Sequence, residues 1–143
     1  MKWCFLMEKK EMIGEIKEKT SVAIIKEFVA DGAIIQYNSV GEFKGKYHAS
    51  HIETVDVKLK MDGTNEWDVR AMEMTKEGDV VMITGKGIGK QENAMEGSFK
   101  GEVTYMTNSP RLGWLNNTKA WVEGMTDLKN NEATMKIYQE QKP

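Results

Sequence analysis

The chain has 143 residues, of which 40% are hydrophobic and 29% are charged, and its formal net charge is −2. A chain of this length forms one domain, and its hydrophobic content excludes a mainly disordered state. The near balance of charges leaves no excess of basic residues for binding nucleic acid or an anionic membrane surface, so we expect neither partner.

The first residues bear on where the protein resides. The apolar run at residues 3–7 is too short for a signal peptide or a membrane-spanning helix, so we predict a cytoplasmic protein. The single cysteine, Cys4, cannot form an internal disulfide, which agrees with that compartment. Translation could start at Met1 or at Met7.

Residues 1–20 are expected to form an N-terminal extension, and residues 21–143 to form the folded domain. Within the extension, the spacing of Met12, Ile13 and Ile16 fits one face of a short helix over residues 8–19. Because Gly14 weakens a helix, an irregular strand is the alternative.

From residue 21 onward the pattern is that of strands joined by polar turns. Asp31-Gly32 is a two-residue hairpin signal between two apolar, β-prone segments. Strict alternation of apolar and polar residues predicts strands with one buried face at residues 55–61 and 95–107. Shorter runs predict further strands at residues 21–29, 33–37, 66–75, 80–84, 118–126 and 132–139.

Two segments depart from simple alternation. In residues 66–75 the apolar positions change parity at Met72, which predicts a bulge or a strand covered on both faces. Residues 85–90 (GKGIGK) match no phosphate-binding motif, and we expect a flexible hairpin or a barrel corner there.

These elements predict an all-β fold, an antiparallel closed barrel of about eight strands preceded by a short extension or helix. A two-sheet sandwich is the alternative. The pattern G-x-F-x-G occurs at residues 41–45 and again at residues 97–101, and glycines beside an inward aromatic are typical of strongly coiled strands.

The G-x-F-x-G strand and the segment LNNTKAWVEG at residues 115–124 resemble small bacterial proteins of unknown function with an allene-oxide-cyclase-like (calycin-like) β-barrel. The resemblance covers residues 60–138. It implies an eight-stranded antiparallel barrel, often oligomeric, with an apolar cavity. The plant cyclase relatives act on an oxylipin and the dirigent relatives steer phenolic coupling. No catalytic residue of the family maps onto this chain, and a lipocalin-like barrel remains an alternative.

Large apolar side chains on the inward parity could fill the core or line a pocket. Arg70 could hold an anionic group of a ligand, and methionines could supply adaptable apolar walls. The candidate ligand-binding residues are Trp67, Val69, Arg70, Met72, Phe99, Tyr105 and Trp114, with Met74, Met82, Met95, Met106 and Met135 as further wall candidates.

His48, His51 and Glu53 form the pattern H-x-x-H-x-E. On a strand His51 and Glu53 share a face while His48 lies on the other, so the three residues can converge on a metal ion only if a turn falls between Ala49 and Ser50. We therefore expect neither a metal site nor another cofactor. His51 and Glu53 are expected near one another at the mouth of the barrel, where they could act on a ligand.

Three functions fit this reading. The first is binding of a small apolar or amphipathic molecule inside the barrel. The second is a cyclase- or isomerase-like enzyme that uses the same cavity. The third is a filled barrel that acts as a homo-oligomer or binds a partner through an apolar outer patch.

Overall fold

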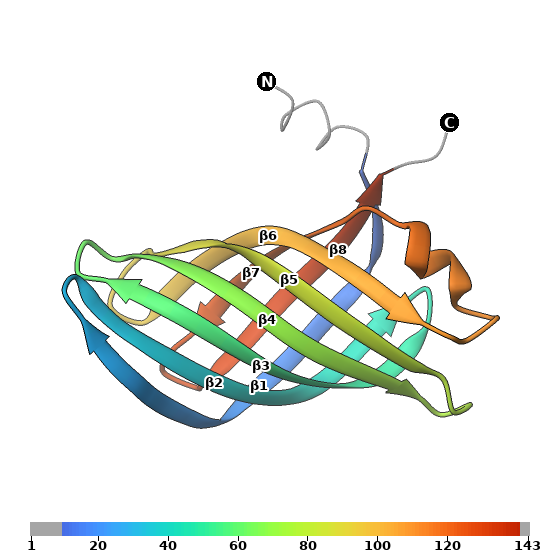
Figure 1. Cartoon of the computed structure of the whole chain (residues 1–143), viewed down its shortest axis with the longest axis horizontal. Coiled ribbons are helices and arrows are strands. Elements are labelled where there is room, and N and C mark those ends of the chain that lie inside the picture. Colours follow the sequence, from blue (N-terminus) through green and yellow to red (C-terminus); the bar gives the residue numbers. More distant parts are fainter. Residues whose placement is uncertain (1–9, 141–143) are drawn as a thin grey trace.

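A computed structural model of the chain describes residues 10–140 and contains eight strands and one short 3-10 helix. Each strand pairs antiparallel with the next in the sequence, and β8 pairs with β1, so the sheet closes into a barrel (Figure 1). The elements are β1 (Lys10–Val29), β2 (Gly32–Gly45), β3 (His48–Lys60), β4 (Thr64–Thr75), β5 (Val80–Gln91), β6 (Glu96–Thr107), η1 (Gly113–Asn117), β7 (Ala120–Asp127) and β8 (Glu132–Glu140). The predicted all-β closed barrel of eight strands is confirmed.

The beginning of the chain differs from the prediction. Strand β1 begins at Lys10 and pairs with β8 as far as Lys19, so residues 10–20 are part of the barrel wall and no helix forms over them. The register against β8 shifts between Met12 and Gly14, which lets Ile13 and Ile16 both lie buried although their spacing does not fit a regular strand. The prediction of an alternative start at Met7, and Cys4, lie outside the described residues.

The bulge predicted in residues 66–75 is absent. Strand β4 pairs with β3 and with β5 in continuous register, so Met72 and Met74 face outward while Trp67 and Glu73 face inward. The hairpin or corner expected at residues 85–90 is likewise wrong, because these residues lie inside β5.

The glycines of β5 do not form a turn but allow close packing inside the barrel. A Cβ placed on Gly87 would lie 2.5 Å from the Trp67 ring and 2.7 Å from the Cα of Gly101 on β6. These two glycines let β5 and β6 approach each other and leave room for the indole inside the barrel.

The two ends of the barrel differ. At one end, which we call the closed end, the β6–β7 connection with η1 covers the interior, and Leu112 and Leu115 are buried there (Figure 1). At the other end, which we call the open end, the inward-facing side chains of β2 and β3 keep partial exposure, among them Tyr37, Val55 and Val57. Solvent therefore reaches the interior from the open end.

The part of β1 after Lys19 forms a free edge at the open end. The pairing of β1 with β8 ends at Lys19, whereas its pairing with β2 continues to Val29, and β2 is itself paired with β3 from Gly32 to Lys44. This part of β1 exposes apolar side chains, of which Phe28 at 79% is the most accessible; the others are Val22, Ile24 and Ile25.

Candidate functional site

Polar side chains gather inside the barrel toward its closed end, among otherwise apolar neighbours. They come from three strands, β1, β3 and β4, and from one turn, and the strand residues point inward because alternate residues of a strand share a face. The set, which we call the interior polar cluster, comprises Glu18 of β1, Tyr47 of the β2–β3 turn, His51 and Glu53 of β3, and Glu73 of β4.

His51 lies at the centre of the cluster and is 2% exposed. Its Nδ1 lies 2.8 Å from Oε2 of Glu73, and its Nε2 lies 2.8 Å from Oε1 of Glu53. The hydroxyl of Tyr47 donates a hydrogen bond of 2.5 Å to the other oxygen of Glu73. The imidazole is therefore fixed at both nitrogens, and Glu73 is fixed at both oxygens.

Glu18 of β1 approaches the imidazole of His51 across the intervening strand, β2. Between β1 and β3 lies Gly41 of β2, whose missing side chain makes this approach possible: a Cβ there would lie 2.7 Å from the Cβ of Glu18. Oε2 of Glu18 lies 3.7 Å from Nε2 of His51 and has no hydrogen-bond partner.

Burial and neighbouring charges shift the protonation of the cluster. Burial, with the nearby Glu53 carboxylate, raises the pKa of Glu18 to about 10, so its carboxyl group is neutral at pH 7. Burial by itself lowers the pKa of His51, but its hydrogen bonds and charge interactions with Glu53 and Glu73 outweigh this and raise that pKa to about 10. Burial also raises the pKa values of Tyr47 and Tyr105, which stay protonated.

Apolar side chains form the walls between the cluster and the open end. They pack against the core but stay partly exposed, and they are Val55, Val57, Val69, Ala71, Phe99 and Ala133. The indole of Trp67 meets the Phe99 ring edge to face, with centroids 6.0 Å apart, and its Nε1–H donates to the carbonyl of Ile88. The interior thus has a polar floor and apolar walls.

Half of the candidate residues from the sequence lie inside the barrel. The structure brings His51 and Glu53 together as expected, but it buries them inside the barrel and not at its mouth, because both lie on the inward face of β3. Trp67, Val69, Phe99 and Tyr105 also point inward. His48 faces outward, as its parity predicts, and lies 3.7 Å from Glu42.

Other candidates lie elsewhere. Arg70 is on the outer wall, where it pairs with Asp56 and Asp68 instead of facing the interior. Trp114 is on η1 at the closed end, with the ammonium group of Lys46 over its ring. Among the six methionines proposed as walls, Met135 is buried inside, whereas Met72, Met74, Met82, Met95 and Met106 lie on the outer wall or in a turn.

The sequence analysis did not single out Glu18, Tyr47 or Glu73. A signal for Glu73 existed, because it shares the parity of Trp67 and Val69, and an acidic residue in an apolar row is unusual. The bulge expected in residues 66–75 concealed it. Glu18 follows Ile16 in the same way, but residues 10–20 were not assigned to the barrel.

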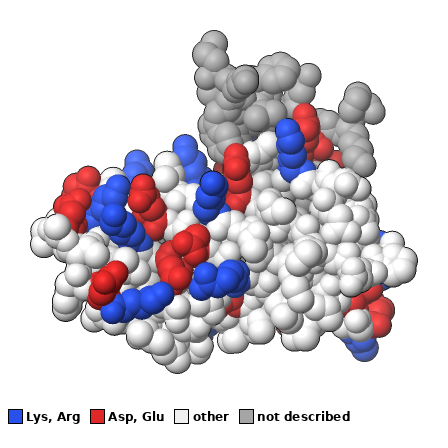
Figure 2. Space-filling model, viewed as in Figure 1, with Lys and Arg blue, Asp and Glu red and all other residues white. Residues whose placement is uncertain are grey.

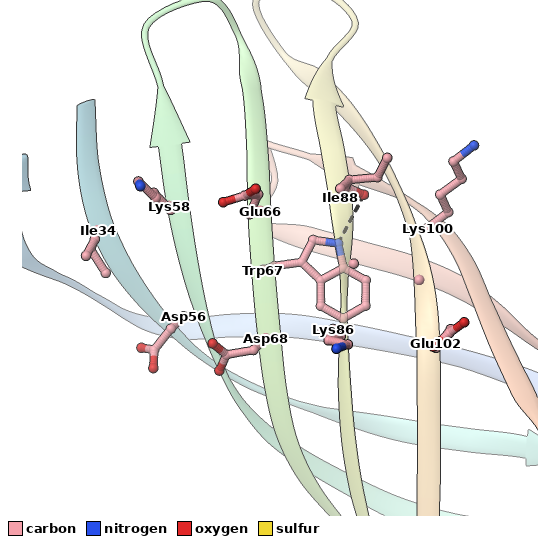
Figure 3. Close-up of a pocket in the computed structure, with 12 residues that line it drawn as sticks. Ile34, Asp56, Lys58, Glu66, Trp67, Asp68, Lys86, Ile88, Lys100 and Glu102 are labelled. Carbon is pink, nitrogen blue, oxygen red and sulfur yellow. Dashed lines mark hydrogen bonds between the residues drawn. The ribbon is translucent and has the colours of Figure 1, made fainter. Parts of the chain in front are cut away.

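A depression of about 730 Å³ lies on the outer wall over β2 to β6 (Figure 3). Its rim is charged, with acidic and basic side chains from neighbouring strands, such as Lys86 opposite Asp68 and Glu102. Cross-strand pairs of opposite sign neutralise one another. The depression is open and lies outside the wall, away from the interior polar cluster.

The outer wall also carries an uncharged row that crosses five strands. Val40, Ile52, Met72, Met82 and Met106 are successive cross-strand partners from β2 to β6. With Met74 and Val80 beside them, all but the half-buried Met72 are between 42% and 62% exposed. Figure 2 shows the same feature, since the half of this face nearer η1 has few charged side chains. We call these seven residues the outer apolar row.

A scan of protein-family descriptions finds no match, and a search of curated proteins finds no relative. Solved structures do share the fold. A protein of unknown function from Clostridium acetobutylicum superposes with a TM-score of 0.80 at 16% identity, covering 91% of this chain and 97% of that one. A β-barrel-like protein from Acinetobacter baumannii gives 0.77 at 18% identity, covering 91% and 94%.

An enzyme from Penicillium herquei superposes with a TM-score of 0.66 at 19% identity, covering 92% of this chain and 93% of that one. These likenesses show the fold alone. The chain is a small closed antiparallel β-barrel of a kind found in bacterial proteins of unknown function. None of these proteins is described as allene-oxide-cyclase-like, so that resemblance stays a prediction. Among the described residues, no helix is long and apolar enough to cross a membrane.

Proposed function

We propose that the barrel binds a small amphipathic molecule that enters at the open end. The observation that carries this proposal is the contrast along the interior: partly exposed apolar walls lead to a buried polar floor. Small-molecule sites combine these two features, with apolar surface for affinity and a few polar groups for orientation.

The carboxyl groups of the interior polar cluster determine which polar group of a ligand can bind there. Glu18, Glu53 and Glu73 place three carboxyl groups around one imidazole, and the ion pairs among the described residues give them no Lys or Arg partner. A ligand with a hydroxyl or amino group can donate hydrogen bonds to these oxygens, whereas a carboxylate ligand is repelled. We therefore expect long-chain alcohols, amines and alkylphenols to bind better than fatty acids of the same length.

The test uses the fluorescence of Trp67, which faces the interior, with a chelator present throughout. The variant Ala71→Phe fills the space between the walls and should weaken binding at least tenfold. Its matched control is Met72→Phe, the next residue of β4, which faces outward and should leave the affinity unchanged. Equal affinities in the two variants, or no response to any of the amphiphiles, would refute the proposal.

A cyclase- or isomerase-like reaction is a second use of the same interior. Charged groups in a water-poor site stabilise developing charge more strongly than they do in water. Glu53, with its side chain 9% exposed, is the cluster residue best placed to meet a bound molecule. Turnover of a bound ligand that is lost in Glu53→Gln, while binding persists, would separate this function from binding alone.

We propose further that copies of the chain associate through the outer apolar row. The row contains no charged residue. In a dimer with twofold symmetry the same surface of each copy forms the interface, so that surface must be complementary to itself. An uncharged row meets this condition because it brings no like charges together. Its exposed side chains amount to on the order of 600 Å², close to the roughly 800 Å² per partner of a standard interface.

Sedimentation of three proteins tests the association. Met82→Glu in the middle of the row should shift the wild-type assembly toward monomer. The control Met61→Glu changes a methionine that is 84% exposed in the β3–β4 turn, away from the row, and should sediment like the wild type. A monomeric wild type at high concentration would refute the proposal.

A further inference from the structure

Three donor atoms of the interior polar cluster converge on one point. A carboxylate oxygen of Glu18, a ring nitrogen of His51 and a carboxylate oxygen of Glu53 all lie within 4.8 Å of one another. Nε2 of His51 is 2.8 Å from Oε1 of Glu53 and 3.7 Å from Oε2 of Glu18. Donors bound at about 2.0–2.2 Å to a tetrahedral ion lie roughly 3.4 Å apart, between these two distances. Small side-chain movements would therefore complete a coordination site.

Glu18 provides an independent indication that a ligand binds between these three donor atoms. Its side chain is 5% exposed. Its carboxyl group shares a hydrogen bond with Glu53, whereas its Oε2, which lies 3.7 Å from Nε2 of His51, has no hydrogen-bond partner. Buried polar atoms in folded proteins are nearly always satisfied, because an unsatisfied one is destabilising. A cation held between this oxygen and the imidazole would satisfy it.

His51 is oriented as metal-binding histidines are. Its Nδ1 side faces Oε2 of Glu73 at 2.8 Å, and Glu73 is itself held by the hydroxyl of Tyr47. In metal sites a carboxylate commonly accepts the proton of one ring nitrogen and so leaves the other nitrogen to bind the metal. Here the nitrogen that remains is Nε2, which faces Glu18 and Glu53.

The charges of the cluster also favour a cation. Three carboxyl groups surround one imidazole, and their only ion-pair partner among the described residues is His51. Binding of the ion displaces the protons that Glu18 and His51 hold at pH 7. Two carboxylates and a neutral imidazole then balance the charge of one divalent ion, which leaves Glu73 to interact with the Nδ1–H group and with Tyr47.

We propose that Glu18, His51 and Glu53 bind one divalent transition-metal ion of the Zn²⁺ type. One nitrogen and two oxygen donors suit Zn²⁺ or Mn²⁺ better than the softer ions that prefer sulfur. Three protein ligands leave a coordination position free, as in sites that bind a water or a substrate. The inference that no metal site exists rested on His48, which does face outward; the third ligand comes instead from β1. The site does not depend on the proposed small-molecule ligand, since every donor belongs to the protein.

The first experiment titrates the chelator-treated protein with Zn²⁺ alone in a calorimeter. We expect one ion per chain with micromolar or tighter affinity. Glu18→Gln and Glu53→Gln should each weaken binding at least tenfold, and Glu73→Gln, which disturbs the orientation of His51, about 10- to 100-fold. The control His48→Gln alters the outward histidine near Glu42 and should bind Zn²⁺ like the wild type. Undiminished binding in Glu18→Gln, or loss of binding in His48→Gln, would overturn the proposal.

The second experiment needs no variant and therefore does not depend on how well the variants fold. The chain has two histidines, so the imidazole ¹⁵N resonances of His48 and His51 can be followed separately in the wild-type protein. Addition of Zn²⁺ should move the Nε2 resonance of His51 to the position of a metal-bound nitrogen and leave both His48 resonances in place. An unchanged His51 spectrum at saturating Zn²⁺ would overturn the proposal.

Discussion

The interior polar cluster makes the stability of the metal-free barrel fall as the pH rises above neutrality. In the folded chain the pKa values of Glu18 and His51 are both about 10, whereas their ordinary values are 4.5 and 6.5. The folded state therefore holds more protons than the unfolded state wherever the pH lies between the ordinary and the raised value. Stability must fall as the pH rises through this window.

The size of the effect follows from the proton count. Between pH 7 and pH 9 the folded chain keeps one proton on Glu18 and one on His51 that the unfolded chain has lost. Each such proton changes the free energy of unfolding by about 1.4 kcal/mol per pH unit. The two groups together predict a fall of about 3 kcal/mol per unit, a large part of the 5–15 kcal/mol typical of a domain.

The variant Glu18→Gln isolates one of the two contributions. Glutamine stays neutral at every pH and can still donate a hydrogen bond to Glu53, so the slope should halve to about 1.4 kcal/mol per unit. The assay is urea unfolding followed by circular dichroism at four pH values from 7 to 9, with a chelator present. A free energy of unfolding that is independent of pH, or a slope that does not change in Glu18→Gln, would refute the reasoning.

Three further changes test the packing of the barrel by thermal and urea unfolding. Phe43→Ala removes a side chain that is fully buried against Tyr47 and should lower the free energy of unfolding by about 3–5 kcal/mol. The control Phe28→Ala, at 79% exposure, should lower it by less than about 0.5 kcal/mol. Equal losses would contradict the assignment of Phe43 to the inside and Phe28 to the outside. Gly124→Val should lower stability by several kcal/mol or prevent folding, because even its Cβ would lie 2.3 Å from the Phe99 ring, and a stable variant would show that the ring moves freely. Tyr47→Phe removes the hydrogen bond to Glu73 and should cost about 1–3 kcal/mol, measurable as a lower unfolding midpoint; no loss would mean that Glu73 is held in some other way.

The sequence predicted the fold well because each barrel strand has one buried face. The alternation around Val55 and Val57, the hairpin at Asp31-Gly32 and the repeated glycine–phenylalanine pattern all depend on local spacing, and all agree with the structure. The first strand was harder to identify, since the register shift between Met12 and Gly14 breaks the period of two that marks a strand.

The site was only half predictable for a different reason. His51 and Glu53 are two residues apart, so their common face can be deduced from the sequence. Glu18 and Glu73 meet His51 through the closure of the sheet and through the registers of β1, β2, β3 and β4, which no local pattern specifies. The space that admits Glu18 depends on a glycine in a third strand, Gly41, and that significance is visible only in three dimensions.

The free edge of β1 has a consequence for how the barrel opens. Between Ser21 and Val29, β1 pairs with β2 and with no other strand among residues 10–140, whereas β2 is held on its far side by β3. This segment of β1 can therefore separate from the wall by breaking β1–β2 hydrogen bonds alone. Amide hydrogens here should exchange faster with solvent than those of the closed half, in which each strand has a paired neighbour on both sides. A guest wider than the resting entrance could then be admitted by local fraying of one strand, with the rest of the cylinder intact.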